Sequence, residues 1–114
     1  MKLPHVENVM VALDKARYLL DPNHAQNGGK AAFFLAFGFR LDAPEMLAEA
    51  LLRHVLDYEV TDVQQHPYGT RYTVSGSLHT PDGRNPTVDA GWFIDPGSVT
   101  PRLTTATPGR KGSS

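Results

Sequence analysis

The sequence contains no cysteine among its 114 residues, which excludes disulfides and metal sites built on thiolates. It has no apolar run long enough to span a membrane, and its first residues lack the apolar centre of a secretory signal. An excess of one charge is missing too, because the formal net charge is −1. That balance argues against a basic coat for nucleic acid, although a local basic patch is compatible with it. We therefore expect a soluble, cytoplasmic protein, with delivery into another cell left open.

Metal and nucleotide motifs are also missing. No two histidines stand at a metal-ligand spacing on one helix, and no carboxylate pattern joins them, so we expect no metal and no cofactor. The segment Gly28-Gly29-Lys30 lacks the first glycine, the loop length and the Ser or Thr of a phosphate-binding loop, so a nucleoside triphosphatase is not expected. The five histidines are His5, His24, His54, His66 and His79.

The first half of the chain has the apolar spacing of helices. After an arm that covers residues 1–8, helices are predicted over Val9–Leu20, over Gly29–Gly38 and from Asp42 to near Tyr58. Turn-forming residues separate the first two helices, and Pro44 suits the first turn of the third. With 40% hydrophobic residues, the chain can build one modest core.

The second half alternates polar and apolar residues, as strands do. Strands are predicted over Val60–Gln65, Tyr68–Leu78, Thr87–Ile94 and Pro101–Thr107, and residues 108–114 are predicted to be a disordered tail. Helices followed by strands predict a single α+β domain over residues 9–107. Its N-terminal helices should pack on one face of a C-terminal antiparallel sheet of about four strands.

The alternation assigns side chains to the two faces of this sheet. Within the last strand, Leu103 and Thr105 are expected to oppose Arg102, Thr104 and Ala106. The helices should cover Tyr72, Val74, Val88, Trp92, Ile94 and Leu103. The open face should carry Arg71, Thr73, Ser75, Thr87, Asp89, Arg102 and Thr104.

The open face has the side chains of a phosphate-binding surface. Arg71 and Arg102 could grip a phosphate in bidentate fashion, and the threonines and Ser75 could donate further hydrogen bonds. The alternative is that exposed strands are generally rich in Thr, Ser and Arg, and that Asp89 forms only a weak cross-strand ion pair.

Four other residues are candidates for the same chemistry. Lys30 stands at the positive end of a helix, close in sequence to His24, and the two could form a small anion site; the alternative is a solvated lysine. Tyr68 lies at a turn and could stack on a base, whereas Trp92 is expected in the core. Arg84 lies at a hairpin tip.

Several short motifs together carry a resemblance to a known group of proteins. In order, they are Asp21-Pro-Asn-His24, Gly29-Lys-Ala-Ala-Phe33, Tyr68-Gly-Thr-Arg-Tyr72, Gly83-Arg84, Trp92 and Pro101-Arg-Leu-Thr-Thr105. Over residues 19–106 the chain resembles a family of small bacterial domains, similar in layout to toxins of toxin–antitoxin and polymorphic secretion systems. Such toxins often have the barnase-like ribonuclease architecture. A histidine is common in that family where this chain has Gly29, so His24 would replace it.

The resemblance implies a metal-independent endoribonuclease toxin, with RNA and a small cognate antitoxin or immunity protein as partners. The candidate catalytic residues are His24, Lys30, Arg71, Arg102, Thr104 and Thr105. The candidate substrate-binding residues are Tyr68, Thr73 and Arg84. One alternative is a non-enzymatic interaction module, either an antitoxin or immunity protein or an enzyme inhibitor, which uses the open face or an unpaired strand edge. Another is an accessory domain whose motifs are only structural. The oligomeric state stays open.

Overall fold

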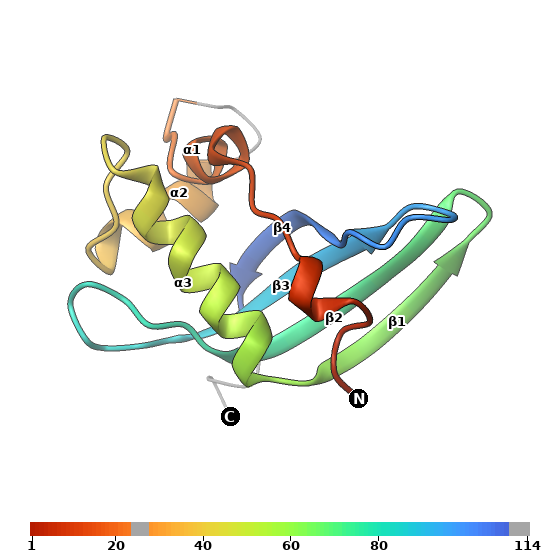
Figure 1. The fold of residues 1–114 in the computed structure, drawn as a ribbon. Coiled ribbons are helices and arrows are strands. Elements are labelled where there is room, and N and C mark those ends of the chain that lie inside the picture. The colour runs from red at the N-terminus through yellow and green to blue at the C-terminus, as the bar shows by residue number, and fades with distance from the viewer. Residues whose placement is uncertain (24–27, 110–114) are drawn as a thin grey trace.

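The computed structural model describes residues 1–23 and 28–109. Three helices precede a four-stranded sheet, as predicted, and a short 3-10 turn, η1, lies in the N-terminal arm (Figure 1). The elements are η1 (Val6–Asn8), α1 (Leu13–Leu19), α2 (Gly28–Ala36), α3 (Pro44–Asp57), β1 (Val60–His66), β2 (Gly69–Ser77), β3 (Thr87–Ile94) and β4 (Arg102–Pro108). β4 therefore includes Pro108, and residues 110–114 of the expected tail lie outside the described part.

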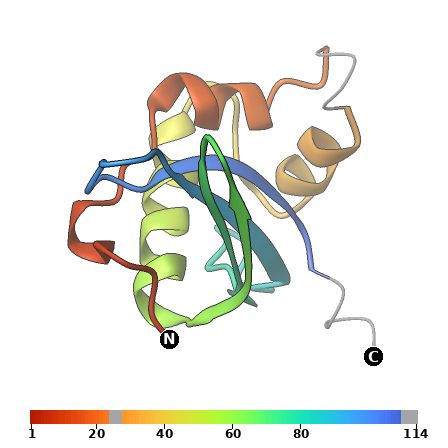
Figure 2. The ribbon, with the colours of Figure 1, turned by 90° about the vertical axis from the view of Figure 1, so that its right-hand side faces the viewer.

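The strands follow one another across the sheet in the order β1-β2-β3-β4, and every neighbouring pair is antiparallel. Helices α1 and α3 lie against one face, and α2 lies beside β4 (Figures 1 and 2). The predicted α+β fold class is confirmed. The alternation of β2 and β3 explains this arrangement, because only one of their faces is apolar enough to need a cover.

The core fills the space between the helices and the sheet. The indole of Trp92 on β3 is fully buried, and it shares the core with Phe34 of α2, Leu47 and Leu51 of α3 and Leu3 of the N-terminal arm. Burying each such side chain contributes about 1.5–3 kcal/mol to folding. Of the residues expected under the helices, Val74, Val88, Trp92 and Leu103 are buried, whereas Tyr72 and Ile94 are half-buried.

The first helix is shorter than predicted, because it begins at Leu13 and not at Val9. Met10 instead pairs with the start of β4: its N–H donates to Pro101 O at 3.1 Å, and Leu103 N–H donates to Met10 O at 3.3 Å. Such pairing needs an extended backbone, so tertiary contacts override the helical spacing at residues 9–11.

A β-bulge in β4 changes which side chains reach the open face. Gly91 pairs with Thr105, but the next residue of β3, Trp92, pairs with Leu103, so Thr104 is an extra residue. The expected alternation within this strand is therefore wrong beyond Thr104. Ala106 is fully buried in the core, and Thr105 lies on the open face. A bulge adds one residue and reverses the faces that follow.

His54 joins α3 to the middle of the sheet. Its Nε2 atom lies 3.1 Å from Gly76 O and 3.0 Å from Val88 O, and the side chain is almost completely buried. Two carbonyl acceptors require a proton on this nitrogen. Burial lowers the pKa of His54, because the charged imidazolium would lose its hydration there. We conclude that the neutral ring acts as a structural donor between β2 and β3.

Candidate anion site on the open face of the sheet

The open face of the sheet contains a polar groove of about 530 Å³. It crosses all four strands near their middle, and we call it the sheet groove. The residues that line it are Thr61, Asp62, Gln64, Arg71, Thr73, Asp89, Gly91, Thr105, Thr107 and Pro108. Among them are Arg71, Thr73 and Thr105, three of the candidates from the sequence, which come from two different strands.

Gly91 on β3 forms the floor of the sheet groove. A β-carbon at this position would stand 3.1 Å from Thr104 Oγ1, 3.1 Å from Thr105 Cγ2 and 3.2 Å from Arg71 Nη2. The bulge brings both threonines to this point, and Thr104 Oγ1 donates to Gly91 O at 3.0 Å. A glycine inside a strand often marks a place where another group approaches the backbone. The missing side chain leaves a bare patch of backbone between Arg71 and two hydroxyls.

Lys30 reaches the same place from α2. Its Nζ donates to Thr105 Oγ1 at 3.1 Å, across 75 residues of sequence. Lys30 is the third residue of α2, which lies beside β4 (Figure 2), so a side chain at the helix start can bend over the end of the sheet. The ammonium group adds to the positive charge of the helix N-terminus. The helix and the bulge together bring Lys30, Thr104, Thr105 and Arg71 into one constellation.

Among the described residues, no carboxylate compensates the charge of Arg71. Within residues 1–23 and 28–109, every other arginine forms an ion pair with an aspartate, and Arg71 forms none. Lys30 also has no carboxylate within ion-pair distance in the described part of the chain. The paired arginines are Arg17, Arg40, Arg53, Arg84 and Arg102, whose partners are Asp14, Asp42, Asp57, Asp82 and Asp95. Two uncompensated cations beside donor hydroxyls are suited to an anion.

Two carboxylates also line the sheet groove, and they limit what it can accept. The carboxylate of Asp89 accepts a hydrogen bond from Ser75 Oγ at 2.6 Å, and Asp62 projects from β1. The groove is therefore positive around Gly91 and negative around Asp62 and Asp89. Such an arrangement suits a ligand that carries one anionic centre beside hydroxyl or amino groups.

A row of planar side chains stands at one end of the sheet groove. The ring of Tyr68 stacks on His66 with centroids 4.9 Å apart and on Phe93 with centroids 5.9 Å apart. The guanidinium of Arg102 lies over Phe93, 5.1 Å from its centroid. Tyr68 is still 65% exposed, so its hydroxyl end is accessible to a ligand. Two stacking partners of Tyr68 thus come from the chain itself.

Two further sequence candidates, Arg102 and Arg84, lie apart from Gly91. Arg102 donates to Asp95 at 3.2 and 3.3 Å and lines a separate depression near Met10. Arg84 donates to Asp82 and to Ala36 O at the end of α2, and its guanidinium lies 4.3 Å from the ring centroid of Phe37. His24 lies outside the described residues.

Three residues that shape this surface were given no role from the sequence: Gly91, Phe93 and Gln64. The signal that could have identified Gly91 is an isolated glycine between apolar and aromatic residues of a buried strand. Among the described residues, no three His, Asp or Glu side chains gather as metal ligands, and no helix has the length and apolar character needed to cross a membrane.

Comparisons with known proteins extend the description. Residues 2–110 match the model of DUF6883, a domain of unknown function. The fold is similar to a chain in a contact-dependent growth inhibition toxin–immunity protein complex from Klebsiella pneumoniae 342. The TM-score is 0.69 and the identity 17%, over 91% of this chain and 96% of that one. At this identity the likeness shows a shared fold. No curated protein matches the sequence.

Proposed function

Since the chain belongs to the DUF6883 family, whose function is unknown, we propose from its site that it is a metal-independent endoribonuclease toxin. The observation that supports this most is that Arg71, Lys30, Thr104 and Thr105 meet above the bare backbone of Gly91. Neither Arg71 nor Lys30 has a carboxylate partner in the described part of the chain. A cationic centre with hydroxyl groups suits the phosphate of a nucleic acid. Likeness to a chain of a toxin–immunity protein complex agrees with the toxin role.

RNA carries its own nucleophile, the 2′-hydroxyl. In the proposed reaction the 2′-oxygen forms a bond to phosphorus while the bond from phosphorus to the 5′-oxygen breaks. A base takes the proton of the 2′-hydroxyl, and an acid returns a proton to the leaving 5′-oxygen. Negative charge builds up on the phosphate oxygens between these events, and Lys30 and Arg71 are placed to stabilise it. His24, a few residues before Lys30, is the proposed base or acid.

The threonines have separate roles in this proposal. Thr104 Oγ1 uses its hydrogen to hold Gly91 O at 3.0 Å and so fixes the bulge, whereas Thr105 Oγ1 accepts a hydrogen bond from Lys30 at 3.1 Å. Thr105 can donate its own hydrogen to a phosphate oxygen. Thr73 lines the groove on β2 beside Arg71 and can contact the sugar.

Flanking nucleotides would meet the row of planar side chains. Arg102 pairs with Phe93 in the sheet, and Phe93 pairs with Arg71, so Arg102 lies two strands from Arg71 in the same row. We assign Arg102 to a neighbouring phosphate and Tyr68 to a neighbouring base. Arg84, whose guanidinium donates to Ala36 O at the end of α2, would contact only a longer RNA.

The test is cleavage of RNA by the purified protein, together with growth of bacteria in which it is induced. We expect that the wild type slows growth and cuts single-stranded RNA without added metal. Arg71→Ala should lower the cleavage rate at least about 100-fold, as the loss of one preorganised charge stabiliser does. Arg53→Ala is the matched control, because Arg53 is paired with Asp57 on α3. A wild-type protein that neither slows growth nor cuts RNA would refute the proposal.

A second candidate is a protein-interaction module, either an antitoxin or immunity protein or an enzyme inhibitor. Asp62 and Asp89 in the sheet groove favour it, since they oppose a long polyanion. The growth assay separates the two functions. An immunity protein or antitoxin leaves growth unchanged and protects cells only against its cognate toxin, whereas a toxin stops growth when expressed alone.

A further inference from the structure

β1 is the outermost strand of the sheet, and its outer edge is open. In the part of the chain that the structure describes, β2 is the only strand that pairs with it (Figure 1). Residues Thr61–Gln65 are all exposed, and Val63 at their centre is a 43% exposed apolar side chain. Free backbone N–H and C=O groups along such an edge can pair with another strand.

The two edge strands of the sheet, β1 and β4, differ in how far other segments cover them. The start of β4 is covered by Met10, whose backbone exchanges hydrogen bonds with Pro101 and Leu103. At β1 only the first residue is covered: Val60 N–H donates to Met1 O at 2.7 Å, and the Met1 amino group pairs with Glu59 at 3.0 Å. Residues 61–65 contain no lysine and no proline, which are two of the side chains that discourage edge pairing. The charge of Asp62 and the register shift between Val60 and Asp62 lie at the start of this segment and leave residues 63–65 regular.

The free segment is complementary to itself in one antiparallel register. With Val63 opposite Val63 of a second copy, Thr61 faces Gln65 and Asp62 faces Gln64. An apolar pair then lies at the centre, and each carboxylate meets a neutral amide. A register centred on Asp62 would place two carboxylates opposite each other, which is destabilising. Charge and hydrophobicity thus favour the Val63-centred register over the Asp62-centred one.

We propose that β1 pairs with β1 of a second copy of this chain around a twofold axis at Val63. The pairing is isologous and joins two four-stranded sheets into one, with both helical layers on the same side. Asp62 and Gln64 line the sheet groove, so Asp62 of the partner subunit and Gln64 of the partner subunit extend the groove on its open β1 side. Five residues from each strand bury less than a standard interface, so the dimer is weak and concentration-dependent. This inference does not depend on the ribonuclease proposal.

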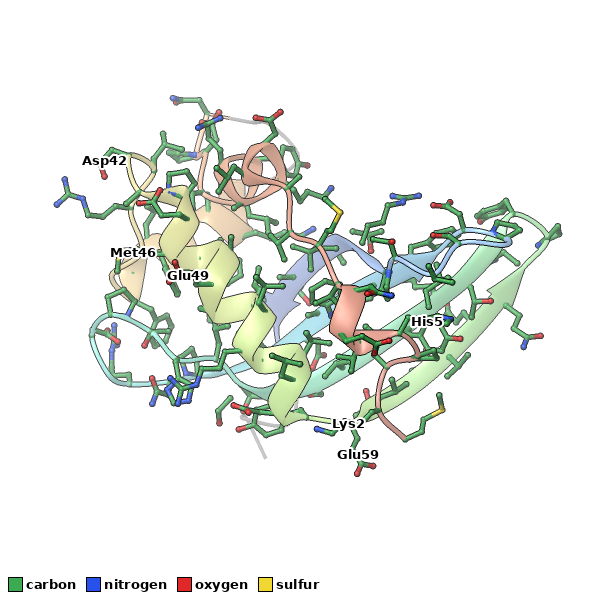
Figure 3. The ribbon with its side chains drawn as sticks, in the orientation of Figure 1. Lys2, His5, Asp42, Met46, Glu49 and Glu59 are labelled. Carbon is green, nitrogen blue, oxygen red and sulfur yellow. The ribbon has the colours of Figure 1, made fainter. Side chains whose placement is uncertain are left out.

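Because the chain has no cysteine, single introduced cysteines can test the pairing cleanly. Val63→Cys places two thiols opposite each other across the axis. Met46→Cys is the matched control: Met46 lies on α3, far from β1 (Figure 3), and it is also 43% exposed. Under mild oxidation at about 50 µM, we expect Val63→Cys to form a disulfide-linked dimer at least tenfold faster than Met46→Cys.

The register has its own test. Thr61→Cys and Gln65→Cys should each cross-link slowly alone and rapidly when mixed, since they face each other only in the Val63-centred register. Sedimentation of the wild type should show a mass that rises from monomer towards dimer with concentration. Equal cross-linking rates for Val63→Cys and Met46→Cys would overturn the proposal and leave this edge to a different protein. Fast self-cross-linking of Thr61→Cys would overturn the register.

Discussion

Replacing Gly91 by alanine tests directly whether the bare backbone of β3 is a seat for an anion. The new β-carbon would stand 3.1–3.2 Å from Thr104 Oγ1, Thr105 Cγ2 and Arg71 Nη2. These separations are shorter than ordinary contacts, so the neighbours must move by a few tenths of an ångström. Arg71 can swing away because its side chain is long. The two threonines belong to a paired strand and can move less.

The methyl group also raises the floor of the sheet groove. An oxygen of a ligand can approach a carbon of the backbone to about 3.3–3.6 Å. In Gly91→Ala the ligand oxygen must keep this distance from the new β-carbon, which extends about 1.5 Å, one C–C bond, from the backbone into the groove. A hydrogen bond lengthened by more than about 1 Å is lost, and a hydrogen bond to a charged group contributes about 1.5–3 kcal/mol. We therefore expect at least tenfold weaker binding.

The assay is titration with inorganic phosphate and with a 2′-deoxy oligonucleotide, which has no internal nucleophile. Gly29→Ala is the control, since a β-carbon at that exposed helical position has nothing within 4 Å. Gly91→Ala should bind both probes at least tenfold more weakly, while Gly29→Ala binds as the wild type does. If Gly91→Ala folds and binds within twofold of the wild type, the anion does not sit on Gly91 and the reasoning is refuted.

Three further predictions concern the lysine and the packing under the sheet. Lys30→Ala should lower RNA cleavage at least about 100-fold, with partial recovery in Lys30→Arg, and cleavage kinetics at saturating RNA would check this. Burial lowers the pKa of His54 in the folded protein. Below about pH 6.5, His54 therefore binds a proton in the unfolded chain but stays neutral in the folded protein. Stability should then drop by up to about 1.4 kcal/mol per pH unit, down to the folded pKa. Urea midpoints at pH 8 and pH 5 would show this slope, and His54→Gln should lose it. Gly76→Ala would place a β-carbon in steric overlap with Cγ, Cδ1 and Cδ2 of the Tyr58 ring and should cost about 1–3 kcal/mol, so an unchanged urea midpoint would contradict this packing.

The regular parts of the fold follow from the sequence because local and tertiary preferences agree there. The alternation of β2 and β3 predicts which side chains are buried, and Trp92 lies in the core as expected. Pro44 lies in the first turn of α3 as predicted, although the helix begins at Pro44 and not at Asp42. By contrast, the segment around Met10 has helical spacing but is extended, because pairing with β4 outweighs a weak helical preference.

The candidate site could be predicted only in part. Arg71 and Thr73 follow from simple alternation, and Lys30 was singled out by its place at a helix start. That Lys30 meets Thr105 could not be predicted, because it depends on how α2 lies beside β4. The sequence also gives no sign of the bulge, which moves Thr105 to the open face and Ala106 into the core. Nor does it show that Arg102 pairs with Asp95 while Arg71 pairs with no carboxylate in the described part of the chain.

Three departures from regular structure coincide at one point of the molecule. The bulge at Thr104 interrupts the alternation of β4, Gly91 leaves a hole in the side chains of β3, and Lys30 adds positive charge to the positive end of α2. Each of them lowers the stability of the fold: a bulge disrupts the hydrogen-bond ladder, a glycine in a strand has no side chain to pack, and a lysine is unfavourable at a helix N-terminus. A second register shift lies in β1, between Val60 and Asp62, on the outermost strand of the sheet. Several locally destabilising features around an arginine that has no carboxylate partner among the described residues are expected at a binding site and not on an inert surface. This coincidence is a stronger reason to place function at Gly91 than the number of polar side chains on the face.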